Sequence, residues 1–210
     1  SFWKSRNLFS KRFLAAGGKW RTTMSTVALK IEDLPHYTYD DYMHWEGQWE
    51  IINGIPYAMT PAPSVKHQEL SLEIAFQLKT LLKNCSHCKV LPPVDWQITE
   101  DTVVQPDVLV VCGDPKNIRK EKLTVPPVMV FEILSPKTVQ KDKVLKYQLY
   151  QNAGVKYYCI IDPKTLSAVV FVMQEDKYRQ EGEFNEGKMM FDIGPCQFEL
   201  DFGKIFSVFK

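Results

Sequence analysis

The sequence predicts a mixed α/β fold, in which helices cover the faces of a central β-sheet. A helical pattern is followed by three strand-like runs, a second helical pattern and further strands, an order typical of such a sheet. The 210 residues suit one domain with a substantial core, since 45% of them are hydrophobic and 24% are charged. No apolar run approaches the ~18 residues of a membrane span, so we expect no membrane partner.

The first 23 residues differ from the rest of the chain. Their charged residues are all basic: Lys4, Arg6, Lys11, Arg12, Lys19 and Arg21. A basic, acid-poor stretch can be a targeting segment, a nucleic-acid-binding arm or sequence that lies upstream of the protein. We expect a basic extension over residues 1–23 and a single domain over 24–210. That domain has a net charge of −5, which excludes a uniformly basic nucleic-acid surface but not a local basic groove.

The first half of the chain predicts a short helix, a hairpin and a long helix. Thr38 is a suitable N-cap for the short helix. Asn53-Gly54 stands between two apolar runs, the strongest short-range signal for a hairpin. Ser64 can cap a helix over residues 65–82. The apolar positions of that helix recur at helical spacing: Leu70, Ile74, Leu78 and Leu81.

Strands dominate the second half of the chain. We expect strands over residues 94–98, 103–112, 128–134, 156–161 and 168–173. Between the third and fourth of these, residues 139–152 predict a helix that Gly154 ends. The helix has apolar positions spaced for a buried face: Val144, Leu145, Leu149 and Tyr150. The tail from Tyr178 to Phe191 is typical of a hairpin.

The five cysteines predict reduced thiols in an intracellular protein. Their number is odd, and Cys112 and Cys159 lie in apolar runs, which argues against a disulfide framework. Cys85 and Cys88 have the CxxC spacing of a zinc site, but no second such pair completes four ligands. We therefore expect two ordinary thiols at a polar helix end, with zinc as the minor alternative, and a cytoplasmic location.

Two carboxylates interrupt apolar strand patterns. Asp107 begins one apolar run, and Glu132 shares a strand face with Val128, Val130 and Leu134. A buried carboxylate is costly unless it meets a metal, a cation or a proton. The intervening connection is long enough for the two strands to lie side by side. We expect the two acids to meet there, with a divalent cation relieving their repulsion.

A lysine is well placed to neutralise this pair. Asp142, Lys146, Tyr150 and Ala153 form one stripe of the helix that follows the Glu132 strand. Lys146 can therefore lean back toward Glu132. An exposed Asp142–Lys146 pair, which contributes only a few tenths of a kcal/mol, explains the same spacing equally well.

An ordered set of short motifs runs from about Tyr37 to Met173. The motifs are Tyr39-Asp-Asp-Tyr, Trp49-Glu-Ile-Ile-Asn-Gly, Pro61-Ala-Pro-Ser-Val-Lys-His67, Val104-Gln-Pro-Asp107, Val130-Phe-Glu132, Asp142-Lys-Val-Leu-Lys146-Tyr-Gln-Leu-Tyr150 and Gly154-Val-Lys-Tyr-Tyr. In this order they resemble the Uma2 family, a branch of the restriction-endonuclease-like PD-(D/E)XK nuclease superfamily. The resemblance implies a restriction-endonuclease-like core, with a central mixed sheet, flanking helices and added β-hairpins.

The resemblance also implies a site for phosphodiester hydrolysis. Asp107 and Glu132 match the acidic motif positions and would bind Mg²⁺ or Mn²⁺, with the Ile133 carbonyl as a third protein ligand. The metal would lower the pKa of a bound water and stabilise charge on the phosphate. The superfamily lysine would stand two residues after Glu132, where this chain has Leu134. In this family a helix lysine is thought to supply the ammonium, and here that residue is Lys146.

Two further positions match the family: Glu50 would complete the acidic cluster, and His67 would hydrogen-bond the acids or the phosphate. Tyr150 is a candidate hydrogen-bond donor to a site acid. An edge-strand glutamate, a capping histidine and a half-buried tyrosine are the ordinary alternatives. Lys143 is the alternative to Lys146, although it lies about 100° around the helix from Asp142.

The sequence therefore predicts a Mg²⁺-dependent endodeoxyribonuclease that acts on DNA, with a homodimer as one option for cutting both strands. Leu134 motivates the alternative, a non-catalytic nuclease-fold module that binds nucleic acid or a protein. Phosphate contacts need cations. In an acidic domain they must come from the metal, a partner or a local patch formed by Lys137, Lys141, Lys143 and Lys146. We expect Trp45 and Trp49 to be packing residues rather than a base-stacking platform.

Overall fold

The computed structural model describes residues 34–59, 63–118, 122–136 and 138–209. The chain divides into two compact units, residues 1–34 and 35–210, and the elements below belong to the second. The extension expected over residues 1–23 lies outside the described residues. Among the helices of the described part, none has the length and apolarity to cross a membrane.

The described residues form five α-helices, one π-helix and twelve strands. The helices are α1 (Tyr39–Tyr42), α2 (Val65–Leu81), α3 (Pro115–Ile118), the π-helix η2 (Lys141–Lys146), α4 (Tyr147–Asn152) and α5 (Phe202–Ser207). The strands are β1 (Trp49–Ile52), β2 (Ile55–Ala58), β3 (Cys88–Leu91), β4 (Trp96–Thr99), β5 (Thr102–Val104), β6 (Val108–Cys112), β7 (Met129–Ile133), β8 (Tyr157–Asp162), β9 (Ser167–Gln174), β10 (Lys177–Phe184), β11 (Lys188–Asp192) and β12 (Gln197–Asp201).

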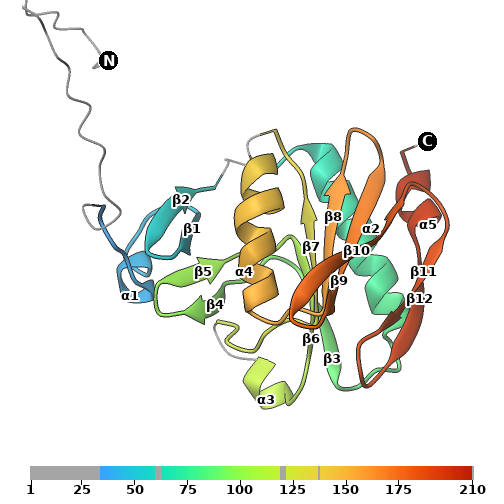
Figure 1. Cartoon of the computed structure of the whole chain (residues 1–210), viewed down its shortest axis with the longest axis horizontal. Coiled ribbons are helices and arrows are strands. Elements are labelled where there is room, and N and C mark those ends of the chain that lie inside the picture. The colour runs from blue at the N-terminus through green and yellow to red at the C-terminus, as the bar shows by residue number, and fades with distance from the viewer. Residues whose placement is uncertain (1–33, 60–62, 119–121, 137, 210) are drawn as a thin grey trace, which may run out of the picture. The chain divides into compact units, whose positions relative to one another are not determined.

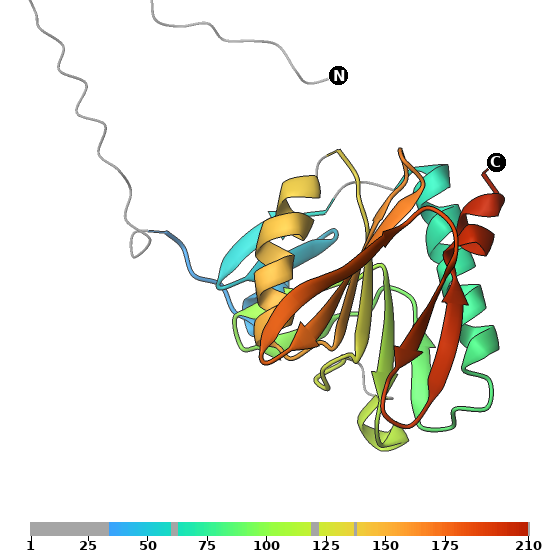
Figure 2. The same ribbon diagram turned by 45° about the vertical axis from the view of Figure 1, so that its right-hand side comes forward.

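A six-stranded mixed sheet in the order β10-β9-β8-β7-β6-β3 forms the centre of the fold (Figure 1). The β7–β8 pair is parallel and its neighbours are antiparallel. Helix α2 packs on one face, where α5 and the β11–β12 hairpin lie beside it (Figure 2). Helices η2 and α4 cover the other face. The expected mixed sheet with helices on both faces is confirmed.

Apolar side chains fill the space on both faces of the central sheet. On the α2 face, Leu70, Ile74 and Leu78 are fully buried against strand residues, as their helical spacing predicts. Leu81 is 40% exposed, so its predicted burial is wrong. On the other face, Tyr150 of α4 stacks on Trp96, with ring centroids 5.6 Å apart. Burial on both sides explains why β6 and β7 are almost uninterrupted apolar runs.

A smaller sheet in the order β2-β1-β5-β4 carries the first hairpin. The hairpin turns at Asn53-Gly54, and both residues have positive φ (51° and 75°), as a two-residue turn between twisted strands requires. The prediction from Asn53-Gly54 is confirmed. Strand β2 is an edge strand, which suits Pro56 because it has no N–H to pair.

The strand expected over residues 103–112 is two strands. Strand β5 belongs to the smaller sheet and β6 to the central sheet, and Gln105-Pro106-Asp107 connects them. Pro106 cannot donate to a strand ladder, which explains the break. The connection therefore joins the two sheets and leaves Asp107 directly before β6.

Two further predictions of local structure are wrong. Strand β10 pairs with β9, and β11 pairs with β12, so residues 178–191 do not form one hairpin. The residues around Cys88, expected to be a polar helix end, form β3 at the edge of the central sheet.

The helix expected over residues 139–152 begins as a π-helix, η2, and continues as α4. Its buried residues include Asp142, Lys146 and Tyr150, whereas Val144 and Leu145 are 47% and 37% exposed. The predicted apolar face is therefore wrong for Val144 and Leu145, whereas Tyr150 is fully buried and Leu149 packs against the core, as predicted. The buried face also carries Asp142 and Lys146, which form ion pairs.

Four of the five cysteines form disulfide bonds. Cys85 is bonded to Cys196, and Cys88 to Cys112 across the β3–β6 pair. Cys159 is free and buried. The expectation of reduced thiols is therefore wrong for four cysteines, and the zinc alternative at Cys85 and Cys88 falls with it. The sequence could not reveal this, because Cys196 joins Cys85 only through the final hairpin.

Candidate active site

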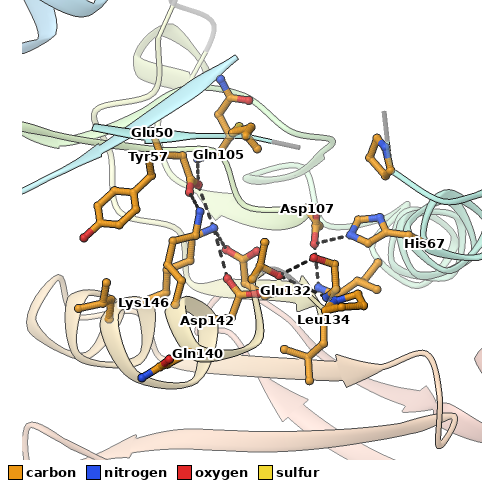
Figure 3. A pocket seen from close by; sticks show the side chains of 18 of the residues that line it. Glu50, Tyr57, His67, Gln105, Asp107, Glu132, Leu134, Gln140, Asp142 and Lys146 are labelled. Atoms are coloured by element: carbon orange, nitrogen blue, oxygen red, sulfur yellow. Dashed lines mark hydrogen bonds and ion pairs between the residues drawn. The ribbon is translucent and has the colours of Figure 1, made fainter. Parts of the chain in front are cut away.

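The acidic residues predicted from the sequence meet beside a cavity of about 910 Å³, which both sheets, α2 and η2 line (Figure 3). Six of the predicted residues line it: Glu50, His67, Asp107, Glu132, Ile133 and Lys146. The seventh, Tyr150, contacts Glu132 from α4. Residues as far apart in the chain as Glu50 and Lys146 thus come together in one place.

Asp107 is positioned by the chain break before β6. The register pairs Val108 with Phe131, so its continuation sets Asp107 opposite Glu132. The Ile133 amide donates a hydrogen bond of 2.7 Å to Oδ2 of Asp107, which fixes the carboxylate at this end of β7. The two strands lie side by side as expected, although Asp107 stands directly before β6 and not on it.

Glu132 is 3% exposed and is held by two donors. Lys146 Nζ donates to its Oε1 at 2.8 Å, and Tyr150 Oη donates to the same oxygen at 2.6 Å. Burial raises the pKa of Glu132 well above its ordinary value. The charge of Lys146 opposes this rise, but three neighbouring carboxylates add to it.

Lys146, on η2, lies among three carboxylates (Figure 3). Besides Glu132, its ammonium contacts Oε1 of Glu50 at 2.9 Å and Oδ1 of Asp142 at 3.8 Å. Burial alone would lower the pKa of Lys146, but Glu132, Glu50 and Asp142 raise it well above the ordinary value. Lys146 is therefore a fixed positive charge.

Glu50 is fully buried between the smaller sheet and η2. Its Oε1 accepts a hydrogen bond of 2.9 Å from the Gln105 amide, and its Oε2 accepts one from Lys141 Nζ. Burial would raise the pKa of Glu50, but Lys146 and Lys141 lower it below the ordinary value. Glu50 is therefore a charged anchor for both lysines.

His67 reaches the site from the first turn of α2, which Ser64 caps as predicted. Its Nε2 lies 3.3 Å from Oδ2 of Asp107. Burial would lower the pKa of His67, but the hydrogen bond and charge of Asp107 raise it, with a backbone contribution from Ile133. His67 Nδ1 is buried and has no hydrogen-bond partner among the described residues.

Of the two lysines considered for the ammonium, Lys146 faces the acids and Lys143 does not. Lys143 is exposed on η2, and Leu134 is buried in the apolar layer beneath the site. The basic patch expected near the site is wrong in part, because Lys141 and Lys146 are already paired with buried carboxylates. Lys137 lies outside the described residues.

Two contributors were not singled out from the sequence. Lys141 was expected only as a phosphate contact, yet it pairs with Glu50. Gln105 stood out only as part of a motif, yet its backbone holds Glu50 and its side chain donates to Asp95 at 2.7 Å. Strand β1 is apolar apart from Glu50. A glutamate in such a strand was the signal that could have indicated cationic partners for its carboxylate.

The charges of the site suit a divalent cation. Four carboxylates face two lysines there: Glu50, Asp107, Glu132 and Asp142 with Lys141 and Lys146. Within the part of the chain that the structure describes, Oδ1 of Asp142 is buried without a hydrogen-bond partner, and burial raises the pKa of this carboxyl. The described residues contain no group of three or more His, Cys, Asp and Glu side chains arranged to hold a metal. Mg²⁺ needs only one or two carboxylates besides water and phosphate, so Asp107 and Glu132 fit it.

Comparison with known proteins shows which solved structure has a similar fold. No curated protein matches the chain. Among solved structures, the chain is similar to a protein from Anabaena variabilis described as a "putative nuclease belonging to DUF820". The two share 19% sequence identity, and the match has a TM-score of 0.66 and covers 81% of this chain and 98% of the other. At this identity the match shows a shared fold.

A family model also matches the chain. The model is that of Uma2, described as "Putative restriction endonuclease", and it matches residues 38–202. The match includes every element that supplies the site, from β1 with Glu50 to α4 with Tyr150. The resemblance found in the short motifs is thereby confirmed, and the chain belongs to the Uma2 family.

Proposed function

We propose that the protein is a metal-dependent endonuclease that hydrolyses phosphodiester bonds in DNA. The convergence of Asp107, Glu132 and Lys146 at one cavity carries this proposal. These residues come from a loop, a strand and a helix, and they unite two metal-compatible carboxylates with a fixed ammonium. Membership of a family described as restriction endonucleases supports the same reaction class.

Asp107 and Glu132 would hold Mg²⁺ or Mn²⁺, with the Ile133 carbonyl as a further ligand. Such an ion supplies a water of lowered pKa and stabilises charge on the phosphate. Oε1 of Glu132 already accepts from Lys146 and Tyr150, so these two residues orient the carboxylate.

Lys146 would take the part of the lysine that Leu134 replaces. Its ammonium stays protonated among Glu50, Glu132 and Asp142, so it can donate to the attacking water or to a phosphate oxygen. Glu50 and Lys141 are positioning residues, because they hold Lys146 in place. His67 would orient Asp107 through the 3.3 Å contact.

Cleavage of supercoiled plasmid tests this proposal. We expect nicking with Mg²⁺ or Mn²⁺ and none with EDTA. Asp107→Asn should abolish nicking, whereas Asp176→Asn, at an exposed carboxylate in the β9–β10 turn, should retain it. Lys146→Gln should abolish nicking and Lys143→Ala should not. Circular dichroism would verify the fold of each variant. A folded parent protein that binds Mn²⁺ but cuts neither duplex nor single-stranded DNA would contradict the proposal.

The ion pairs of the site also favour a second candidate, a non-catalytic module. Lys146 fills the space beside Glu132 and Glu50 as an ordinary buried salt bridge would. Calorimetric titration with Mn²⁺ separates the two candidates. An endonuclease should bind Mn²⁺ and lose that binding with Asp107→Asn, whereas a non-catalytic module should bind none.

A further inference from the structure

A second pocket, of about 420 Å³, lies beside the hairpin of the smaller sheet. Its lining is aromatic and polar: Tyr37, His44, Trp45, Glu46, Trp49 and Pro56. The two tryptophans are only partly buried. The expectation that they serve only as packing residues therefore leaves an open aromatic pocket unexplained.

The aromatic walls are fixed in place. Trp45 packs edge to face against Tyr37, with ring centroids 5.0 Å apart, and against Trp49, with ring centroids 5.6 Å apart. The Trp49 indole N–H donates to the Glu46 carbonyl at 2.8 Å. The Tyr37 amide donates to the Gly54 carbonyl at 2.9 Å. A planar ligand would thus meet rings that lose little freedom on binding.

This pocket adjoins the candidate active site. Pro56 lines both cavities. Trp49 and Glu50 are neighbours on β1, where successive side chains point to opposite faces, so the two cavities lie on either side of one hairpin. Strand β2, which carries Pro56, is the edge of its sheet, so a bound chain can pass around it.

We propose that the aromatic pocket binds one unpaired base of a nucleic-acid strand whose phosphates reach the acidic site. This inference rests on the proposed function, which supplies the strand. None of the six lining residues is Lys or Arg, so the pocket offers little to a phosphate. Aromatic faces stack on any base.

The polar lining gives the pocket a base preference. The carboxylate of Glu46 can accept hydrogen bonds but cannot donate them. Guanine presents an N–H and an amino group side by side on its pairing edge, which suits a carboxylate. The pocket should therefore prefer guanine. Stacking also supplies affinity that Lys141 and Lys146 do not, because both are engaged with carboxylates.

Binding without cleavage tests the inference. The probes are fluorescein-labelled single strands of eleven nucleotides in EDTA, with an abasic residue at every position except the centre. The centre is guanine, adenine or an abasic residue. By anisotropy we expect the guanine strand to bind about tenfold more tightly than the abasic one. Trp45→Ala should remove this difference. Glu46→Gln, at an exposed residue that leaves the fold intact, should reduce the preference for guanine over adenine.

Phe76→Ala is the matched control, because it truncates an aromatic residue that is 63% exposed on α2 and absent from the pocket lining. It should leave all affinities unchanged. Equal binding of the three strands, or no binding of any, overturns the inference. So does competition by tetramethylammonium at the tryptophans without a base effect, since the pocket would then be a cation site. Plasmid nicking with equal binding would refute the inference alone, whereas a guanine effect without nicking would refute the proposed function alone.

Discussion

The ammonium of Lys146 lies 2.8 Å from the carboxylate of Glu132, although the two residues belong to a helix and a strand that meet only in the folded chain. Under the proposed function, this ammonium takes the part of a lysine at position 134. It also gives the buried end of β7 a partner for its charge. The contact therefore serves both the stability of the fold and the proposed chemistry.

Replacing Lys146 should destabilise the protein. Lys146→Met leaves Glu132 and Glu50 buried with fewer cations, and removal of one partner from a buried ion pair costs about 3–5 kcal/mol. Lys143→Met, on the exposed side of η2, should change the free energy of unfolding by less than about 0.5 kcal/mol. Urea unfolding measures both values. A loss below about 1 kcal/mol for Lys146→Met would show that the ion pairs contribute little.

Tyr150 should matter through its hydroxyl. Tyr150→Phe removes a 2.6 Å hydrogen bond to Glu132, and hydrogen bonds to charged groups contribute roughly 1.5–3 kcal/mol. Tyr147→Phe is the matched control, because its hydroxyl donates to the Tyr178 carbonyl at 3.2 Å, a neutral contact that is worth about 1 kcal/mol. Thermal unfolding compares the two variants. Equal losses would mean that Glu132 does not depend on Tyr150.

The pKa of His67 should lie above its ordinary value of 6.5, because the hydrogen bond and the charge of Asp107 favour the protonated ring. Since the folded state then binds the proton more tightly than the unfolded state, this stabilisation is full below pH 6.5 and is lost as the pH rises through the folded-state pKa. NMR titration in EDTA measures the value. Asp107→Asn should lower the pKa of His67, because burial then prevails. A pKa that Asp107→Asn leaves unchanged would contradict the contact.

The disulfides give a simple chemical prediction. Denatured but unreduced protein should react as one thiol, that of Cys159, and fully reduced protein as five. The bonds close loops with sequence separations of 111 and 24 residues, so each should stabilise the fold by roughly 3–5 kcal/mol. Thiol titration and urea unfolding with and without reductant test both points. Five reactive thiols before reduction would restore the expectation of a reduced protein.

Local signals predicted the elements that local physics determines. The Asn53-Gly54 turn and the Ser64 cap act within a few residues, so both appeared where expected. The stripe of Asp142, Lys146 and Tyr150 was visible as a spacing, but the sequence alone left its burial and its exposure equally open. Tertiary contacts settled that question, because Glu50 and Glu132 come from other parts of the chain.

The remaining errors concern burial and strand pairing, which tertiary contacts determine. Val144 and Leu145 have helical spacing, and an apolar side is ordinarily the buried side. Here the π-helical turn presents charges to the sheets, and π-helical turns often occur at functional sites. The break at Pro106 and the pairing of β10 with β9 depend in the same way on which sheet each strand joins.

The connection Gln105-Pro106-Asp107 joins the two sheets. One end holds Glu50 through the Gln105 amide, and the other end carries Asp107, two residues away. A rotation of the smaller sheet would therefore move Glu50, the anchor of Lys146, while the Ile133 amide holds Asp107 to the central sheet. A ligand that binds the hairpin would thus shift the anchor of Lys146 relative to Asp107 and Glu132 without contacting any of the three.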